Sequence, residues 1–231
     1  MSMILCLETA TTNCSVALSI NGEIAAVKED YDVKYSHAER LHRYIEEVLA
    51  GVYTERSRSA KAKKEQLTAI AVSKGPGSYT GLRIGVSAAK GLCYALDIPL
   101  ISIPTLDSLS HQITPEAKST IIPMLDARRM EVYSAVYDET HTQIRETQAQ
   151  ILGPSSFEVY LEKGSVHFIG NGVAKFKEIC THPNAVFVED ALPSSKELCA
   201  LAHQKFEAAD FEDVAYFEPY YLKDFIAGVK K

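Results

Sequence analysis

A glycine-rich stretch, SKGPGSYTGLRIG at residues 73–85, holds the first candidates for chemistry in this sequence. Such a loop between a strand and a helix can hold a phosphate group, because the free N–H groups at the helix start point at the anion. The stretch has no P-loop lysine, and Thr80 stands where both the P-loop and the dinucleotide fingerprint require a glycine. Two uses remain open, a weak anion site or a helix cap made by Ser78 or Thr80.

The residues after this loop place small side chains along one side of a predicted helix. Gly81, Gly85, Ala88 and Ala95 recur there. A glycine inside a helix costs roughly 0.5–1 kcal/mol relative to alanine, so its presence indicates that another backbone must come close. From the residues alone, packing on the chain's own sheet and contact with another subunit both explain the pattern. Arg83, one turn into the helix, is placed to meet a carboxylate or a phosphate.

Candidates for metal or acid–base catalysis are weak. His37 and His42 are five positions apart, which separates them by about 140° around a helix, whereas a zinc-protease motif uses positions i and i+4. No G-x-S-x-G elbow of a serine hydrolase occurs. Asp126 ends an apolar strand and precedes Arg128 and Arg129, so an ion pair or a hairpin turn is favoured over a catalytic role.

The composition is that of a globular protein, with 231 residues of which 46% are hydrophobic and 23% charged. A net charge of −6 argues against a chain that binds nucleic acid tightly on its own. One basic stretch, residues 54–66, could steer an anionic partner, although a solvated loop is the favoured interpretation. Its basic residues are Arg56, Arg58, Lys61, Lys63 and Lys64.

The N-terminal residues and the cysteines indicate the compartment. The opening MSMILCLETATTNC contains an apolar run of only five residues, too short for a signal peptide or a membrane span. The five cysteines form no CxxC pair and mostly lie in apolar runs. We therefore expect a cytoplasmic protein with reduced, structural cysteines and no membrane contact.

Hydrophobic periodicity predicts two mixed α/β halves, the first of which includes a hairpin turn at Asn21-Gly22 and a helix capped by Ser36. The first half is expected to have strands at residues 3–8, 14–20, 23–31, 67–73 and 99–103 and helices at 37–52 and 80–96. The second is expected to have strands at 120–125, 131–137, 143–151 and 165–169 and helices at 106–112, 155–162, 173–180 and 194–208. This repetition predicts a duplicated architecture with domains 1–103 and 104–231, the last segment packing back on the first domain.

Several stretches, taken in order, resemble the TsaB (YeaZ) family over essentially the full chain. They are ILCLETATTNCSVAL, HAERL, AVSKGPGSYTGLRIGVSAAKGL, IPTLDSL, MLDARRMEVYSAVY and EPYYLKDF. The resemblance implies the fold of actin, sugar kinases and chaperone ATPases, which consists of two ribonuclease-H-like subdomains with mixed sheets flanked by helices.

The same resemblance implies a function in the bacterial machinery that makes N6-threonylcarbamoyladenosine at position 37 of tRNA. The chain is expected to be a non-catalytic scaffold that pairs with the catalytic subunit TsaD, joins the ATPase TsaE in a complex, and forms a homodimer when alone. It reaches tRNA through the complex and carries no catalytic residue, metal or cofactor of its own. The alternatives are an M22-type metallo-glycoprotease, or a small sugar-kinase-like ATPase that uses Asp126.

The resemblance also implies an interface. The helices at about 37–52 and 80–96 are expected to pair with equivalent helices of TsaD or of a second copy, so that Gly85→Leu abolishes the complex and leaves the fold intact. The interface residues are expected to be Leu41, Ile45, Gly75, Gly77, Ser78, Tyr79, Thr80, Gly81, Arg83, Ile84, Gly85 and Ala88.

Two further sites are expected from the resemblance. The end of the first strand corresponds to the phosphate-binding turn of the fold, and here Glu8, Thr9, Thr11 and Asn13 form a vestigial turn without glycine, which predicts weak or no ATP binding. The basic stretch looks longer than the family norm, which makes it a candidate tRNA contact through Arg56, Arg58, Lys61, Lys63 and Lys64.

Overall fold

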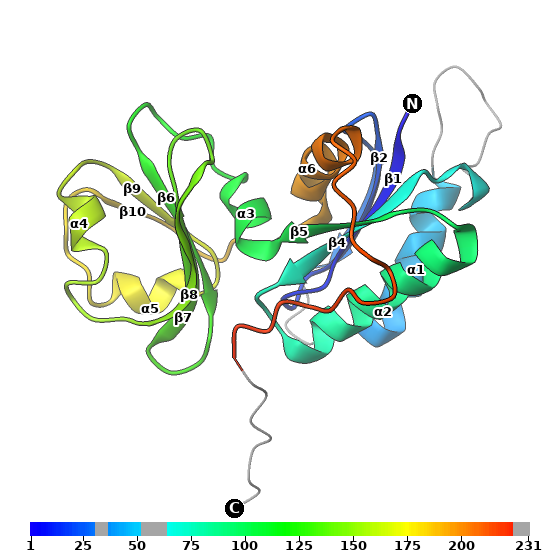
Figure 1. Ribbon diagram of the computed structural model, residues 1–231. Coiled ribbons are helices and arrows are strands. Elements are labelled where there is room, and N and C mark those ends of the chain that lie inside the picture. The colour runs from blue at the N-terminus through cyan, green and yellow to red at the C-terminus, as the bar shows by residue number, and fades with distance from the viewer. Residues whose placement is uncertain (31–36, 52–63, 224–231) are drawn as a thin grey trace, which may run out of the picture.

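The computed structural model describes residues 1–30, 37–51 and 64–223, and it shows two lobes side by side (Figure 1). Each lobe is built on one five-stranded mixed sheet. We call the lobe around the first sheet lobe 1 and the lobe around the second sheet lobe 2.

The sheet of lobe 1 has the strand order β3-β2-β1-β4-β5. β1 pairs antiparallel with β2 and β2 with β3, whereas β1, β4 and β5 run parallel. The central strands β1 and β4 are almost entirely buried, as expected for apolar strands covered on both faces. The strands are β1 Met3–Glu8, β2 Cys14–Ile20, β3 Glu23–Asp30, β4 Ala69–Gly75 and β5 Leu100–Pro104.

Three helices cover the sheet of lobe 1. α1 (His37–Ala50) and α2 (Tyr79–Leu96) pack on one face, and α6 (Ser195–Glu207) packs on the other (Figure 1). A short 3-10 turn, η1 (Lys64–Gln66), precedes β4. The cap expected from Ser36 lies outside the described residues.

The sheet of lobe 2 repeats the arrangement of lobe 1, in the order β10-β9-β6-β7-β8. β6 takes the place of β1. On one side β6 pairs antiparallel with β7 and β7 with β8, and on the other side β9 and β10 run parallel to β6. The duplication predicted from the order of elements is therefore present. The strands are β6 Thr120–Asp126, β7 Glu131–Tyr137, β8 Gln143–Ile151, β9 Val166–Ile169 and β10 Ala185–Val188.

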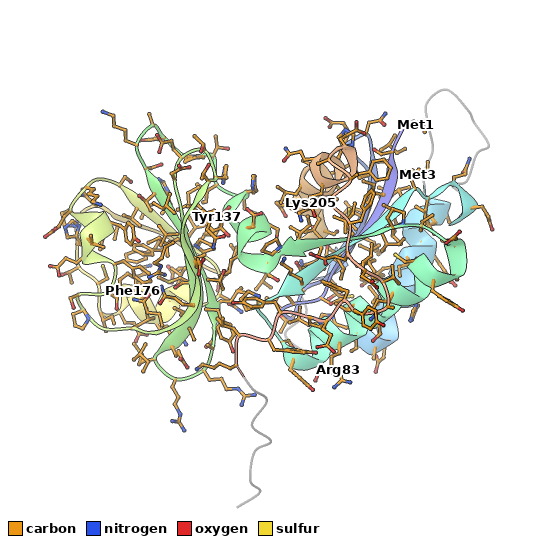
Figure 2. All side chains as sticks on the ribbon, in the orientation of Figure 1. Met1, Met3, Arg83, Tyr137, Phe176 and Lys205 are labelled. Atoms are coloured by element: carbon orange, nitrogen blue, oxygen red, sulfur yellow. The ribbon has the colours of Figure 1, made fainter. Side chains whose placement is uncertain are left out.

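Aromatic rings fill the core of lobe 2. Neighbouring rings of Phe157, Phe168, Phe176 and Phe187 have centroids 4.9–6.2 Å apart, mostly edge to face. Tyr137 lies on the opposite face of the sheet, toward α3 (Thr105–Ser110) (Figure 2). Both faces of this sheet are therefore covered, one by phenylalanines and the other by the segment that joins the lobes.

Lobe 2 differs from the expectation in its short elements. The helices predicted at 155–162 and 173–180 shrink to α4 (Glu158–Leu161) and α5 (Val173–Lys177). Phe157 adopts a left-handed backbone with φ of 66°, which a helix cannot continue through, so α4 begins after it. β10 was not predicted, because its four residues give too short a pattern.

The end of the chain returns to lobe 1. α6 packs on the sheet of lobe 1, and residues 208–223, which we call the C-terminal strap, continue along the same lobe. The Glu212 N–H donates to the Leu100 carbonyl at 2.9 Å, and the Tyr220 N–H donates to the Lys74 carbonyl at 2.7 Å. The strap thus runs past the edge strand β5 to the end of β4.

Two expectations from composition can be compared with the described residues. No helix among them combines the length and the apolar character that crossing a bilayer requires. All five cysteines are buried and free. Burial raises the pKa of the Cys14 and Cys93 thiols to about 12, which keeps these two thiols protonated and unreactive.

Candidate interaction site on helices α1 and α2

Two of the three glycines inside α2, Gly81 and Gly85, face the chain's own first lobe. A Cβ at Gly81 would lie 2.1 Å from the Thr9 carbonyl oxygen, and one at Gly85 would lie 2.3 Å from Thr9 Oγ1. Contacts this short do not occur for real side chains, so these positions must lack a Cβ for the β1–β2 turn to pack. The expectation that Gly81 and Gly85 make room for another subunit is therefore corrected, since Gly81 makes room for the Thr9 carbonyl and Gly85 for the Thr9 side chain.

Gly75, the last residue of β4, and Gly77, in the loop before α2, have the same role. A Cβ at Gly77 would lie 2.5 Å from the Ala10 carbonyl oxygen, and one at Gly75 would lie 2.7 Å from the Tyr220 carbonyl oxygen. Gly75 also has a φ of 111°, which favours glycine. These two predicted interface residues instead allow the β1–β2 turn and the C-terminal strap to pack against the loop.

The two predicted interface residues on α1 are also internal. Leu41 is 0% exposed and Ile45 is 3% exposed. Both pack in the core between α1, α2 and the sheet of lobe 1. Their helical spacing correctly indicated an apolar stripe, but the stripe faces the sheet.

The β1–β2 turn, residues 8–13, uses its own polar groups. The Ala10 N–H donates to Glu8 Oε1 at 2.6 Å, and the Ala10 carbonyl accepts from the Ser78 N–H at 2.7 Å. The Thr9 hydroxyl donates to the Gly81 carbonyl at 2.9 Å. In an active phosphate-binding turn these backbone groups would be free to meet the nucleotide.

The remaining members of the turn are buried as well. Asn13 donates from Nδ2 to the Pro193 carbonyl at 2.9 Å, and His37 donates from Nε2 to the Thr11 carbonyl at 2.7 Å. Glu8 is 0% exposed, and desolvation raises the pKa of its carboxyl to about 7, against the lowering effect of hydrogen bonds from Ala10 and Ser73. The turn is therefore a packed structural element with a carboxyl group that is poorly solvated.

This geometry supports the prediction of weak ATP binding. A triphosphate at the turn would meet the buried Glu8 carboxyl. The Ala10 N–H could not bind the phosphate, because it already donates to Glu8. We expect isothermal titration calorimetry of the isolated chain with Mg-ATP to give no heat of binding at micromolar concentrations. A dissociation constant in the micromolar range would contradict the prediction.

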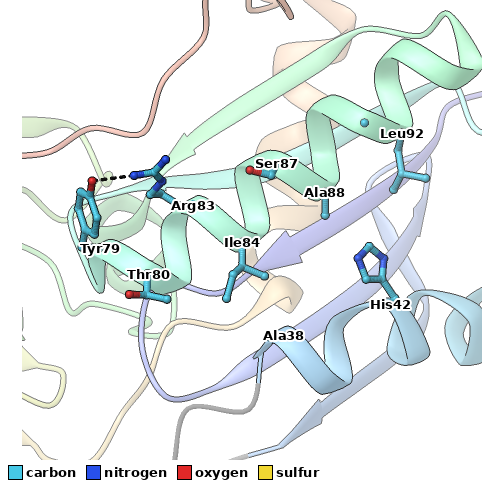
Figure 3. A pocket seen from close by; sticks show the side chains of 10 residues that line it. Ala38, His42, Tyr79, Thr80, Arg83, Ile84, Ser87, Ala88 and Leu92 are labelled. Atoms are coloured by element: carbon cyan, nitrogen blue, oxygen red, sulfur yellow. Dashed lines mark hydrogen bonds between the residues drawn. The ribbon is translucent and has the colours of Figure 1, made fainter.

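The outward face of α2 and the start of α1 form an open groove of about 790 Å³. Figure 3 shows Ile84, Ala88 and Leu92 on the groove side of α2, opposite Ala38 and His42 of α1. The three α2 residues are half-buried, because they also pack on the core beneath. The groove is completed by Tyr79, Thr80, Arg83, Ser87 and Gly91.

One end of the groove carries a polar pair. Arg83 donates from Nη1 to the Tyr79 hydroxyl at 2.8 Å (Figure 3). Its guanidinium carbon lies 5.4 Å from the centre of the Tyr79 ring. Both side chains stand at the groove, so a partner that docks there meets a positive charge at one end and small apolar side chains along the rest.

The predicted interface residues thus divide into two groups. Tyr79, Thr80, Arg83, Ile84 and Ala88 line the groove, and Ser78 caps α2 by accepting from the Gly81 N–H at 3.3 Å. The other six lie inside lobe 1. Ala38, His42, Ser87, Gly91 and Leu92 line the groove and were not predicted. For the three on α2, the spacing from Ile84 and Ala88 was a usable signal.

The structure does not bring catalytic groups together in the described part of the chain. No group of three His, Cys, Asp or Glu side chains there converges as a metal site would require. His37 is hydrogen-bonded to the β1–β2 turn, and His42 lines the groove. The carboxylate of Asp126 pairs with Lys175 at 2.6 Å, as the ion-pair interpretation expected, but its partner is a lysine and not an adjacent arginine.

The basic stretch cannot be placed. Arg56, Arg58, Lys61 and Lys63 lie outside the described residues. Lys64 begins η1, and its side chain is not described. The expected tRNA contact there stays a prediction.

Two successive copies of one five-stranded arrangement define a duplicated ribonuclease-H-like protein, the fold class of actin, the sugar kinases and the chaperone ATPases. Residues 32–231 match the sequence family described as TsaD, tRNA N6-adenosine threonylcarbamoyltransferase. The chain therefore belongs to the TsaD family.

Individual relatives match over almost their full length. The tRNA threonylcarbamoyladenosine biosynthesis protein TsaB of Escherichia coli is 28% identical, with 98% of this chain and 97% of that protein covered. TsaB of Haemophilus influenzae is 27% identical, with 98% and 96% covered. The solved structure of YeaZ from Pseudomonas aeruginosa has a TM-score of 0.77 and 26% identity, covering 96% of this chain and 100% of that one. The chain is thus a full-length homologue of TsaB (YeaZ).

Proposed function

We propose that this chain is a non-catalytic scaffold of the machinery that makes N6-threonylcarbamoyladenosine at position 37 of tRNA. It binds the catalytic TsaD subunit through the groove on α1 and α2 and supports transfer of the threonylcarbamoyl group to adenosine. The ATPase TsaE joins the assembled complex, and tRNA binds to that complex. Without TsaD, two copies of the chain pair through the same groove.

The observation that carries this proposal is the groove itself. Thr80, Ser87 and Gly91 are small and exposed, and beyond the adjoining residues and backbone of its own helix, no described heavy atom lies within 4 Å of a Cβ built at Gly91. Small residues along a helix let a second helix approach closely and pack ridge into groove. Because Gly81 and Gly85 pack on the chain's own lobe, Gly91 is the one glycine of α2 that is left open to a neighbour.

The occupant we propose is an equivalent helix pair of a related subunit. The family match shows that this chain shares sequence with a tRNA N6-adenosine threonylcarbamoyltransferase. Related subunits that pair through the same helices form a contact with approximate two-fold symmetry, in which each groove is filled by its counterpart. This symmetry also explains the homodimer proposed for the isolated chain.

A matched pair of substitutions tests the groove. Gly91→Arg fills the open face of α2 with a long charged side chain, and we expect it to weaken binding to the TsaD subunit by about tenfold or more. The fold should be retained, because arginine favours a helix by nearly 1 kcal/mol over glycine. Binding is measured by calorimetry, and modification by mass spectrometry of tRNA from the reconstituted reaction.

Gly153→Arg is the control, since Gly153 of lobe 2 also has no described heavy atom beyond its chain neighbours within 4 Å of an added Cβ. This variant should bind and support modification as the wild type does. Equal binding by both variants would place the interface elsewhere. Peptide hydrolysis or ATP turnover by the isolated wild-type chain would contradict the non-catalytic assignment.

A further inference from the structure

The turn between β6 and β7, residues 126–131, carries two adjacent arginines in an unusual backbone conformation. Arg128 has a φ of 69° and Arg129 a φ of 49°. Left-handed backbone costs a non-glycine residue roughly 1–2 kcal/mol, and glycine, asparagine and aspartate are the usual residues in such turns. Two consecutive arginines do not favour the stability of this turn, which indicates that their side chains have a function.

Side-chain contacts hold the turn in this conformation. Asp126 Oδ1 accepts from the Arg128 N–H at 2.6 Å. The Lys175 ammonium donates to Asp126 Oδ1 at 2.6 Å, to the Arg129 carbonyl at 2.7 Å and to the Glu131 carbonyl at 2.9 Å. These three hydrogen bonds tie Lys175 to the first, a middle and the last residue of the turn.

The loop beneath the turn is built for close packing. A Cβ at Gly170 would lie 2.3 Å from the Met124 carbonyl oxygen, and one at Gly172 would lie 2.8 Å from Val132. The Gly172 N–H donates to the Met124 carbonyl at 3.0 Å. The loop therefore packs tightly against the strands that carry the turn, and this packing fixes the position of the turn.

The charges around the turn do not cancel. Its two acidic residues are already paired with lysines, Asp126 with Lys175 and Glu131 with Lys223. Arg128 and Arg129 are exposed, and neither makes an ion pair within the described residues. The turn thus carries two uncompensated positive charges on a chain whose net charge is −6.

The turn lies on the same side of the molecule as the docking groove of lobe 1. The C-terminal strap links the two, because the Tyr221 ring lies 5.0 Å from the Tyr79 ring at the start of α2, and Lys223 pairs with Glu131 at the start of β7. Figure 1 shows the strap passing from α2 toward the lower end of the sheet of lobe 2, and Figure 2 marks Arg83 at that end of α2.

We propose that Arg128 and Arg129 bind the phosphodiester backbone of the tRNA held by the assembled complex. This inference rests on the proposed function, which supplies the RNA. Guanidinium groups make paired, charge-assisted hydrogen bonds to phosphate oxygens, and an exposed, braced turn offers them at little ordering cost. The contact is to phosphates and carries no sequence preference, so it positions the tRNA and does not select it.

The test uses the full chain in complex with its TsaD subunit and an unmodified tRNA transcript. Replacing both arginines, Arg128→Gln with Arg129→Gln, is expected to weaken tRNA binding about tenfold near 0.1 M salt. The slope of log K against log salt should become shallower by about 1 to 2. Binding is measured by fluorescence anisotropy at several salt concentrations.

The control variant, Lys118→Gln with Lys163→Gln, removes the same charge from exposed positions of lobe 2, and Lys118 is also left-handed with a φ of 65°. We expect it to bind tRNA with the wild-type affinity and salt slope. Equal affinities and slopes for the two double variants would overturn the proposal, as would loss of complex assembly in the arginine variant, which would assign the turn to a protein partner. Failure of the wild-type chain to bind TsaD would instead overturn the proposed function, and this inference with it.

Discussion

Gly81→Ala is expected to lower the free energy of unfolding by about 2–3 kcal/mol, although alanine is the better helix former. The added Cβ would lie 2.1 Å from the Thr9 carbonyl oxygen, which is backbone and cannot rotate away. Either α2 or the β1–β2 turn must shift, and the Thr9 hydroxyl would lose its hydrogen bond to the Gly81 carbonyl. Urea denaturation followed by circular dichroism measures the change.

Gly91→Ala provides the control on the same helix. Beyond the adjoining residues and backbone of α2 itself, no described heavy atom lies within 4 Å of the added Cβ, so only the helix propensity changes. We expect the free energy of unfolding to rise by roughly 0.5–1 kcal/mol. If the two alanine variants were equally stable, the close packing of α2 on Thr9 would be wrong.

The same packing changes the expectation for Gly85→Leu. From the sequence, this substitution was expected to abolish the complex and leave the fold intact. In the structure a Cβ at this position lies 2.3 Å from Thr9 Oγ1, so a leucine is expected to disrupt lobe 1 itself. Loss of binding by that variant would therefore say nothing about the groove, which is why Gly91 is the better position to change.

Glu8→Gln is expected to raise stability above neutral pH by up to about 3 kcal/mol. Burial raises the pKa of Glu8 from 4.5 to about 7 in the folded state. A carboxyl whose folded pKa lies above its unfolded pKa contributes stability that is complete below about pH 4.5, and that is lost as the pH rises through about 7. Glutamine keeps an oxygen to accept from Ala10 and Ser73 and has no charge to desolvate.

The difference between wild type and Glu8→Gln isolates this effect from the other titrating groups. At pH 5 the two proteins should have similar free energies of unfolding, and at pH 8 the variant should be the more stable. Glu116→Gln, at an exposed position, should follow the wild type at both pH values. A constant difference between wild type and Glu8→Gln across this range would show that the folded pKa of Glu8 is not raised.

The sequence predicted the regular parts of the fold well. The limits of β7 and β8 were predicted to the residue, because turn residues bound both strands clearly. The repeat of strands and helices predicted the duplicated architecture. β10 was missed and α4 was overestimated, because short elements depend on packing, here on the phenylalanine core, more than on local pattern.

The candidate site was predicted only in part. The spacing correctly places Gly81, Gly85 and Ala88 within about 60° of one another around the helix, yet Thr9 covers only the two glycines and leaves Ala88 at the groove. Which face turns inward depends on Thr9, which is separated from Gly81 by 72 positions in the sequence. Similarly, nothing in the local pattern shows that the polar Glu8 is fully buried. A partner distant in sequence decides both features.

The path of the chain between the lobes has a mechanical consequence. The polypeptide crosses once through α3 and again between β10 and α6, and the Lys223–Glu131 pair adds a third tie near the strap. Two covalent crossings leave rotation about the line that joins them as the main rigid-body freedom. The Lys223–Glu131 pair opposes that rotation, because it ties the C-terminal strap on lobe 1 to lobe 2. If the proposed function and the further inference hold, this restraint limits how far the groove and the two arginines can move apart, and so the separation between a bound subunit and a bound nucleic acid.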